Sequence, residues 1–111
     1  MVKELQHPEI DKVPLEQVFQ ALSDPIRMEI VRRLANLPEA TCTVLNGGRP
    51  KSSMTHHYRV LRDSGLVRTS TRGTTHINAL RRAELDRRFP GLLDSLLGAM
   101  AASKPVGQAE G

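Results

Sequence analysis

The chain has 111 residues, enough for one modest domain but too few for a second independent core. Aromatic residues make up only 3% of it, which argues against a protein that stacks the bases of a single strand on aromatic rings. Lysine and arginine outnumber acidic residues by 16 to 12, and the net charge of +4 favours a polyanionic partner.

Two helices are predicted after an N-terminal arm. Residues 1–13 are polar and contain a proline, so we expect a flexible arm. Pro14 suits the first position of a helix. The apolar residues that follow it recur at helical spacing: Leu15, Val18, Phe19 and Leu22. A second helix is expected from Pro25, with Asp24 as its N-cap, and it ends before Pro38.

A glycine-containing turn is predicted between a short helix and a longer basic one. Residues 39–48 have room for one or two helical turns before the breaker Asn46-Gly47-Gly48. The next helix begins after Pro50 and ends at the C-cap signal Ser64-Gly65. Its apolar residues are spaced by four and then three positions: Met54, Tyr58 and Leu61. Two helices joined by so short a turn are typical of a helix-turn-helix motif.

The spacing of apolar residues changes after the basic helix. Residues 66–80 are rich in Thr, Val and Ile and carry Arg72-Gly73 near their middle, which predicts a β-hairpin. Helical spacing returns from Ala83, with an interruption at Pro90 and a dense apolar face beyond it. Residues 103–111 are expected to form a disordered tail.

These elements together predict one winged helix-turn-helix domain over residues 14–102, for DNA binding and dimerisation. The fold class is mainly α with a β-hairpin wing. The expected order is four helices, the two strands of the hairpin, and a fifth helix.

The basic residues gather in the helix-turn-helix and the wing. Residues 49–72 contain six basic residues and one acidic residue, so the rest of the chain is close to neutral. A helix that is basic on one face and apolar on the other can lie in a major groove while it packs on the core. A solvated charged face is the alternative for any such helix. The turn before this helix and the basic hairpin after it favour DNA contact.

Three segments, DPIRMEIVRRLANL, SSMTHHYRVLRDSGLV and the basic hairpin, resemble in order and spacing the ArsR/SmtB family of winged-helix regulators. The resemblance covers residues 15–97 and implies a homodimer on duplex DNA. It also implies that polar side chains at the start of the basic helix reach bases, while arginines contact phosphates. The predicted DNA-binding residues are Arg49, Lys51, Ser52, Ser53, Thr55, His56, Arg59, Arg62, Arg68 and Arg72.

The last helix carries more apolar residues on one face than a monomer of this size can cover. We therefore expect it to form the dimer interface together with the first helix. The predicted interface residues are Leu15, Val18, Phe19, Leu92, Leu93, Leu96, Leu97 and Met100. Two-fold symmetry then implies an inverted-repeat operator with half-sites ~34 Å apart.

The histidines and the single cysteine are further candidates for chemistry. His57 is predicted beside the buried face with a satisfied ring, whereas His56 faces the DNA side. The resemblance implies metal sites that this chain lacks, because its last helix has no histidine and Cys42 replaces a pair of thiols. Cys42 and His7 of two chains remain candidate ligands for nickel or zinc, although two ligands are too few for tight binding. A separate sensor or co-regulator protein is the alternative source of a metal signal.

Other classes of protein fit the sequence less well. An enzyme is not expected, because the chain has no glycine-rich phosphate loop and few acidic pairs. A winged-helix module that binds proteins without DNA is the alternative function. One cysteine, no apolar run near ~18 residues and no signal-like start predict a cytoplasmic protein without a membrane segment. Repression and activation are not distinguished, because the operator position decides between them.

Overall fold

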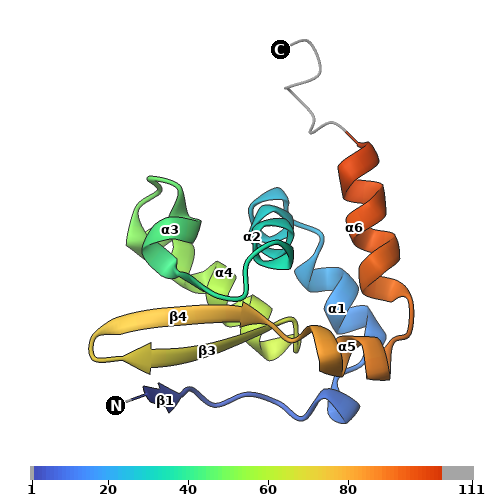
Figure 1. Cartoon of the computed structure of the whole chain (residues 1–111), viewed down its shortest axis with the longest axis horizontal. Helices are drawn as coiled ribbons and strands as arrows, with labels where there is room; N and C mark the ends of the chain where they lie inside the picture. Colours follow the sequence, from blue (N-terminus) through green and yellow to red (C-terminus); the bar gives the residue numbers. More distant parts are fainter. Residues whose placement is uncertain (1, 104–111) are drawn as a thin grey trace.

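The computed structural model describes residues 2–103, in which helices pack on a small antiparallel sheet (Figure 1). The elements are β1 (Val2–Glu4), the 3-10 helix η1 (Ile10–Lys12), α1 (Leu15–Ala21), α2 (Pro25–Ala35), β2 (Ala40–Thr41), α3 (Cys42–Asn46), α4 (Lys51–Asp63), β3 (Val67–Arg72), β4 (Thr75–Leu80), α5 (Arg82–Arg88) and α6 (Leu92–Ala102). None of the helices in this part of the chain combines the length and the apolarity needed to cross a bilayer.

The expected helix-turn-helix and hairpin are present as α3–α4 and β3–β4. Between α3 and α4 the chain turns at Gly47 and Gly48, whose φ angles of 58° and 85° favour glycine. α4 buries Met54, Tyr58 and Leu61, with exposures of 1%, 5% and 0%, as the spacing predicts. They share one aliphatic cluster with residues of α2 and β3: Ile30, Val31, Leu34 and Val67.

The N-terminal segment differs from the loose arm expected for residues 1–13. β1 pairs antiparallel with β3, so that Glu4 lies opposite Ser70. Further along, Ile10 and Val13 are each only 2% exposed and belong to the core. These two apolar side chains anchor a segment whose other residues are mostly polar. The segment is thus part of the fold rather than an appendage.

Gly65, at the end of α4, is needed for this anchoring. Its φ of 81° is unfavourable for other residues, and a Cβ atom there would lie only 2.7 Å from Cδ1 of Ile10. The C-cap glycine predicted from the sequence therefore also makes room for the N-terminal segment.

The sheet and the last helix differ from the expected order of elements. The sheet has four strands in the order β1-β3-β4-β2, because the short β2 adds to β4 and β1 adds to β3. One C-terminal helix is expected from the sequence, whereas the structure has two, α5 and α6. Pro90 and Gly91, which has a φ of 82°, lie between them and turn the chain. The predicted tail beyond Ser103 lies outside the described residues.

Candidate nucleic-acid interface

One face of α4 is exposed, polar and basic, opposite the face that packs on the core. Arg49, in the preceding turn, is exposed as well, and Arg62 is half-buried. The exposed predicted residues of α4 are Lys51, Ser52, Ser53, Thr55, His56 and Arg59. Within residues 2–103, Lys51, Arg59 and Arg62 take part in no ion pair, so their charges are available to a partner.

The hydroxyl groups near the start of α4 differ in the hydrogen bonds that they make. Ser53 Oγ donates to the carbonyl of Pro50 at 2.9 Å, and Thr55 Oγ1 donates to that of Lys51 at 3.1 Å. Their lone pairs stay free, but their protons are used inside the helix. Ser52 makes no side-chain hydrogen bond within the described residues, so it is the better donor to a base edge. Pro50 supplies no side-chain cap, which leaves the helix N-terminus open to an anion.

A buried hydrogen bond fixes α4 against α3. The Tyr58 hydroxyl donates to Oδ1 of Asn46 at 2.5 Å and lies 3.3 Å from the carbonyl oxygen of Cys42. Burial raises the pKa of Tyr58, so the phenol keeps the proton that this bond needs. The angle between the two helices of the motif is therefore set by a specific polar contact as well as by apolar packing.

His57 joins α4 to α2, and its ring is satisfied as predicted. Arg27 Nη1 lies 3.2 Å from His57 Nδ1, and because a guanidinium only donates, Nδ1 is the acceptor. Arg27 Nε also donates to the carbonyl of Ala21 at 2.6 Å, and Asp24 Oδ1 lies 3.9 Å from the same ring nitrogen. His57 thus has a packing role, while the neighbouring His56 is exposed.

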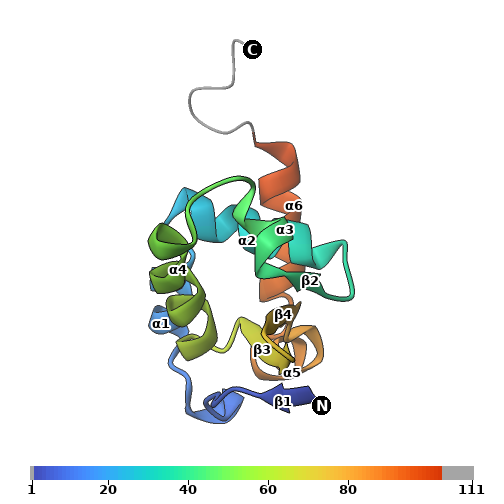
Figure 2. The ribbon, with the colours of Figure 1, turned by 90° about the vertical axis from the view of Figure 1, so that its left-hand side faces the viewer.

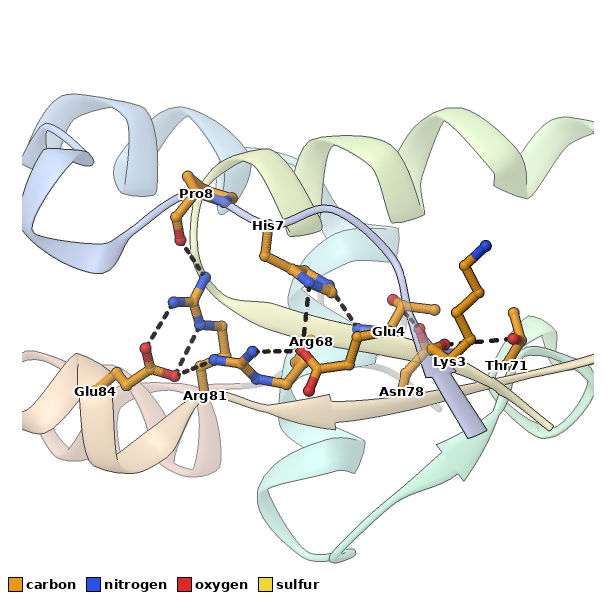
Figure 3. A network of polar contacts seen from close by, with 10 residues as sticks. Lys3, Glu4, His7, Pro8, Arg68, Thr71, Asn78, Arg81 and Glu84 are labelled. Atoms are coloured by element: carbon orange, nitrogen blue, oxygen red, sulfur yellow. Dashed lines mark hydrogen bonds and ion pairs between the residues drawn. The ribbon is translucent and has the colours of Figure 1, made fainter. Parts of the chain in front are cut away.

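The two arginines of the wing are not equally available for DNA. Arg68 is held by Glu4 at 2.7 Å and by Glu84 at 2.5 Å, so it links β1, β3 and α5 (Figure 3). These two pairs make Arg68 less available to a phosphate than a free arginine, and its DNA contact stays a prediction. Arg72, at the end of β3, has Glu39 at 3.0 Å as its one ion-pair partner among residues 2–103, and both side chains are about half exposed. A surface pair of this kind is weak enough to exchange for a phosphate.

Glu84 should make the stability of the protein sensitive to acid. Hydrogen bonds from Arg81 and then Arg68 lower the pKa of Glu84 from 4.5 to about 2. A depressed carboxyl pKa stabilises the folded state above pH 4.5, and this contribution is lost as the pH falls towards 2. In urea unfolding, the stability difference between wild type and Glu84→Gln should therefore shrink over this interval. A difference that is constant with pH would contradict the assignment.

Neither candidate metal ligand is free. His7 Nε2 accepts a hydrogen bond from the backbone N–H of Thr69 at 2.8 Å. Cys42 Sγ accepts one from Asn78 Nδ2 at 3.2 Å. Within residues 2–103, no group of three or more His, Cys, Asp or Glu side chains is placed to hold a metal ion. A metal on His7 would first have to displace the contact to Thr69.

The predicted dimer residues divide into surface and core. Leu15 and Phe19 of α1 are 41% and 52% exposed, which is unusual for such side chains. Val18 and Leu93, at 0% and 3%, pack inside the chain's own core, so of the predicted interface residues they have the least surface to offer a partner. The half-buried candidates are on α6: Leu92, Leu96, Leu97 and Met100. Figure 1 shows α1 and α6 on the side of the molecule away from the tip of the hairpin.

Comparisons with known proteins agree with this architecture. No protein-family model matches the chain. The chain is 31% identical over 83 residues to the uncharacterized HTH-type transcriptional regulator YceK of Bacillus subtilis (strain 168), covering 72% of this chain and 83% of that protein. It is 30% identical over 60 residues to the uncharacterized HTH-type transcriptional regulator MJ1325 of Methanocaldococcus jannaschii, covering 52% and 67%.

A solved structure is also similar. The crystal structure of an ArsR family transcriptional regulator matches with a TM-score of 0.61 and 27% identity, and the match covers 89% of this chain and 98% of that one. Both relatives are named HTH-type regulators. In the structure of this chain, the hairpin β3–β4 follows the helix-turn-helix. The chain therefore belongs to the winged helix-turn-helix family of transcriptional regulators.

Proposed function

We propose that the protein binds duplex DNA as a homodimer and regulates transcription from an inverted-repeat operator. The observation that supports this most strongly is the exposed face of α4, where Lys51 and Arg59 have no acidic partner among residues 2–103. On an ordinary solvated helix face, basic residues are interspersed with acidic ones. Here the only acidic residue of α4 is Asp63, at its C-terminal end.

The arrangement suits a helix that lies in the major groove. Ser52 and His56 are on the first turns of α4, where side chains reach base edges in proteins of this architecture. Arg49 and Arg59 flank them and would contact phosphates, which orient the protein without reading sequence. In Figure 2, α4 lies along one side of the molecule and the hairpin follows its C-terminal end. Arg72 would then contact the backbone beside the groove.

The apolar surface of α1 and α6 supports the dimer. The half-exposed Phe19 of α1 and the partly buried leucines of α6 are apolar surface that favours burial against an identical chain. A symmetric pair of α4 helices would read half-sites about one helical turn, ~34 Å, apart. Direct nickel or zinc sensing gains no support, because His7 and Cys42 already accept hydrogen bonds. A metal signal would more readily reach this chain through a separate sensor or co-regulator protein.

Salt dependence separates this proposal from a protein-binding winged helix. The dissociation constant for a mixed-sequence duplex should rise steeply with salt, and Arg59→Ala should reduce the slope of log K against log[salt] by about one unit for each chain bound. Arg87→Ala is the matched control, since Arg87 is an exposed arginine of α5 that pairs with Asp11. Fluorescence anisotropy of a labelled duplex, repeated over a series of salt concentrations, gives the slopes for wild type and both variants. Equal slopes for wild type and Arg59→Ala would exclude this DNA-binding face.

A further inference from the structure

The N-terminal strand lies beside the tip of the wing. β1 pairs with the last half of β3, with Val2 opposite Arg72 and Lys3 opposite Thr71. Arg72 immediately precedes Gly73 in the turn of the hairpin. Thr71 Oγ1 also donates to the carbonyl of Lys3 at 3.3 Å. The start of the chain, seventy residues away in sequence, is therefore a third strand at the part of the wing that extends furthest from the core (Figure 1).

The alternation of side chains along β1 determines which face of the sheet each charged residue occupies. Successive side chains of a strand face opposite sides of a sheet. Glu4 faces Arg68, at 2.7 Å, so Lys3 faces the other side. That side is shared with Thr69 and Thr71 of β3, and Thr69 is buried on it, where α4 packs against β3. Figure 3 shows the Lys3 side chain extending from the strand on the opposite side from the Glu4 carboxylate.

Lys3 therefore adds a positive charge next to the candidate interface. It is exposed, and within residues 2–103 its ammonium group forms no ion pair. We propose that β1 makes the wing a three-stranded DNA-binding element, in which Lys3 contacts the phosphate backbone between α4 and the tip of the hairpin. This rests on the proposed function. A lysine suits the position because a phosphate contact needs charge and reach rather than a fixed geometry.

His7 is the residue that positions this strand. The backbone pairing ends at Leu5, whose N–H donates to the carbonyl of Thr69 at 3.0 Å. Two residues later, His7 Nε2 accepts the N–H of Thr69 at 2.8 Å, from a side chain that is only 4% exposed. Because Thr69 is fully buried, its N–H would have no partner without this ring. The next residue is fixed as well, since Arg81 Nη1 donates to the carbonyl of Pro8 at 3.0 Å.

The ring must be neutral to accept this hydrogen bond. Burial lowers the pKa of His7, and Arg68 and Arg81 lower it further, against the opposing effect of Glu4. The environment of His7 thus maintains the form that holds β1 on the wing at neutral pH.

The test compares two lysines of the N-terminal segment in the full chain. Lys3→Ala should reduce the salt slope for a mixed-sequence duplex by about one unit for each chain bound. Lys12→Ala removes the same charge from η1, which packs on α5, and should leave the slope at the wild-type value. If Arg59→Ala lowers the slope and Lys3→Ala does not, the three-stranded wing is wrong while the proposed function stands. If neither lowers it, the proposed function itself fails.

Variants of His7 test the positioning role. His7→Leu should speed hydrogen exchange at the Leu5 and Thr69 amides by roughly tenfold or more, and its salt slope should match that of Lys3→Ala. His7→Gln offers an amide oxygen at similar reach and should restore both. Faster exchange with a wild-type salt slope would overturn the proposal, and so would unchanged exchange. Since Lys3 is exposed, its variant decides the DNA contact even if His7→Leu does not fold.

Discussion

Replacing Phe19 with glutamate should convert the proposed dimer into a folded monomer and weaken operator binding by roughly 100-fold or more. The ring is 52% exposed in the isolated chain, so the chain's own core does not depend on it. A carboxylate there would place two charges, one from each chain, in an apolar interface where neither has a partner. A monomer reads one half-site, and the gain from binding two linked half-sites is lost.

Leu37→Glu is the control for this prediction. Leu37 is an exposed leucine, at 42%, but it follows α2 and is not on α1 or α6. This variant should remain a dimer and bind DNA like wild type. Phe19 is a cleaner target than Leu96, which packs partly on the chain's own core. Size-exclusion chromatography with light scattering measures the mass, and a dimeric Phe19→Glu protein would show that the interface lies elsewhere.

Arg81→Met should lower the free energy of unfolding by about 3 kcal/mol, the largest expected loss from a single charged residue. The Arg81 side chain is only 2% exposed and joins three parts of the fold. Its Nε and Nη2 donate to Glu84 at 3.1 and 2.7 Å, and its Nη1 donates to the carbonyl of Pro8. The substitution keeps the apolar volume but leaves the carbonyl of Pro8 without this donor. Of the ion-pair partners of Glu84 among residues 2–103, Arg68 alone would remain.

The neighbouring Arg82 provides a matched comparison. It is 42% exposed and pairs with Asp94, which is itself 78% exposed. Arg82→Met should therefore change the free energy of unfolding by less than about 0.5 kcal/mol. Urea unfolding monitored by circular dichroism gives both values. Similar losses for the two variants would mean that the contacts of Arg81 do not hold the N-terminal segment and α5 together.

The parts of the fold that the sequence predicts are those with local signals. α4 is an example, because the spacing of Met54, Tyr58 and Leu61 and the glycines at each end lie within one stretch of chain. The order of the helix-turn-helix and hairpin follows from such signals. The exposed side of α4 follows as well, since a helix that buries one face presents the opposite one.

The N-terminal strand and the role of Arg68 depend on contacts that are distant in sequence. β1 has only three residues, and its partner strand begins more than sixty residues later. Counting charge along the chain places Arg68 among the basic residues of the wing. Its ion pair with Glu4 has no local signal, because only the pairing of β1 with β3 brings the two residues together. The only local signal was the pair Ile10 and Val13, two apolar residues at helical spacing in a polar segment. A buried histidine in that segment has no sequence signature of its own.

Sequence recognition by α4 is tested most directly by selection from a random-sequence duplex pool. Purified wild-type protein and the His56→Ala variant would each be used to enrich bound duplexes, which are then sequenced. We expect the wild type to enrich an inverted repeat whose half-site centres are about 10 base pairs apart. His56→Ala should retain binding and lose preference at one position in each half-site. A wild-type protein that enriches no motif, or a variant that enriches the identical motif with identical preference, would contradict recognition of DNA through the exposed face of α4.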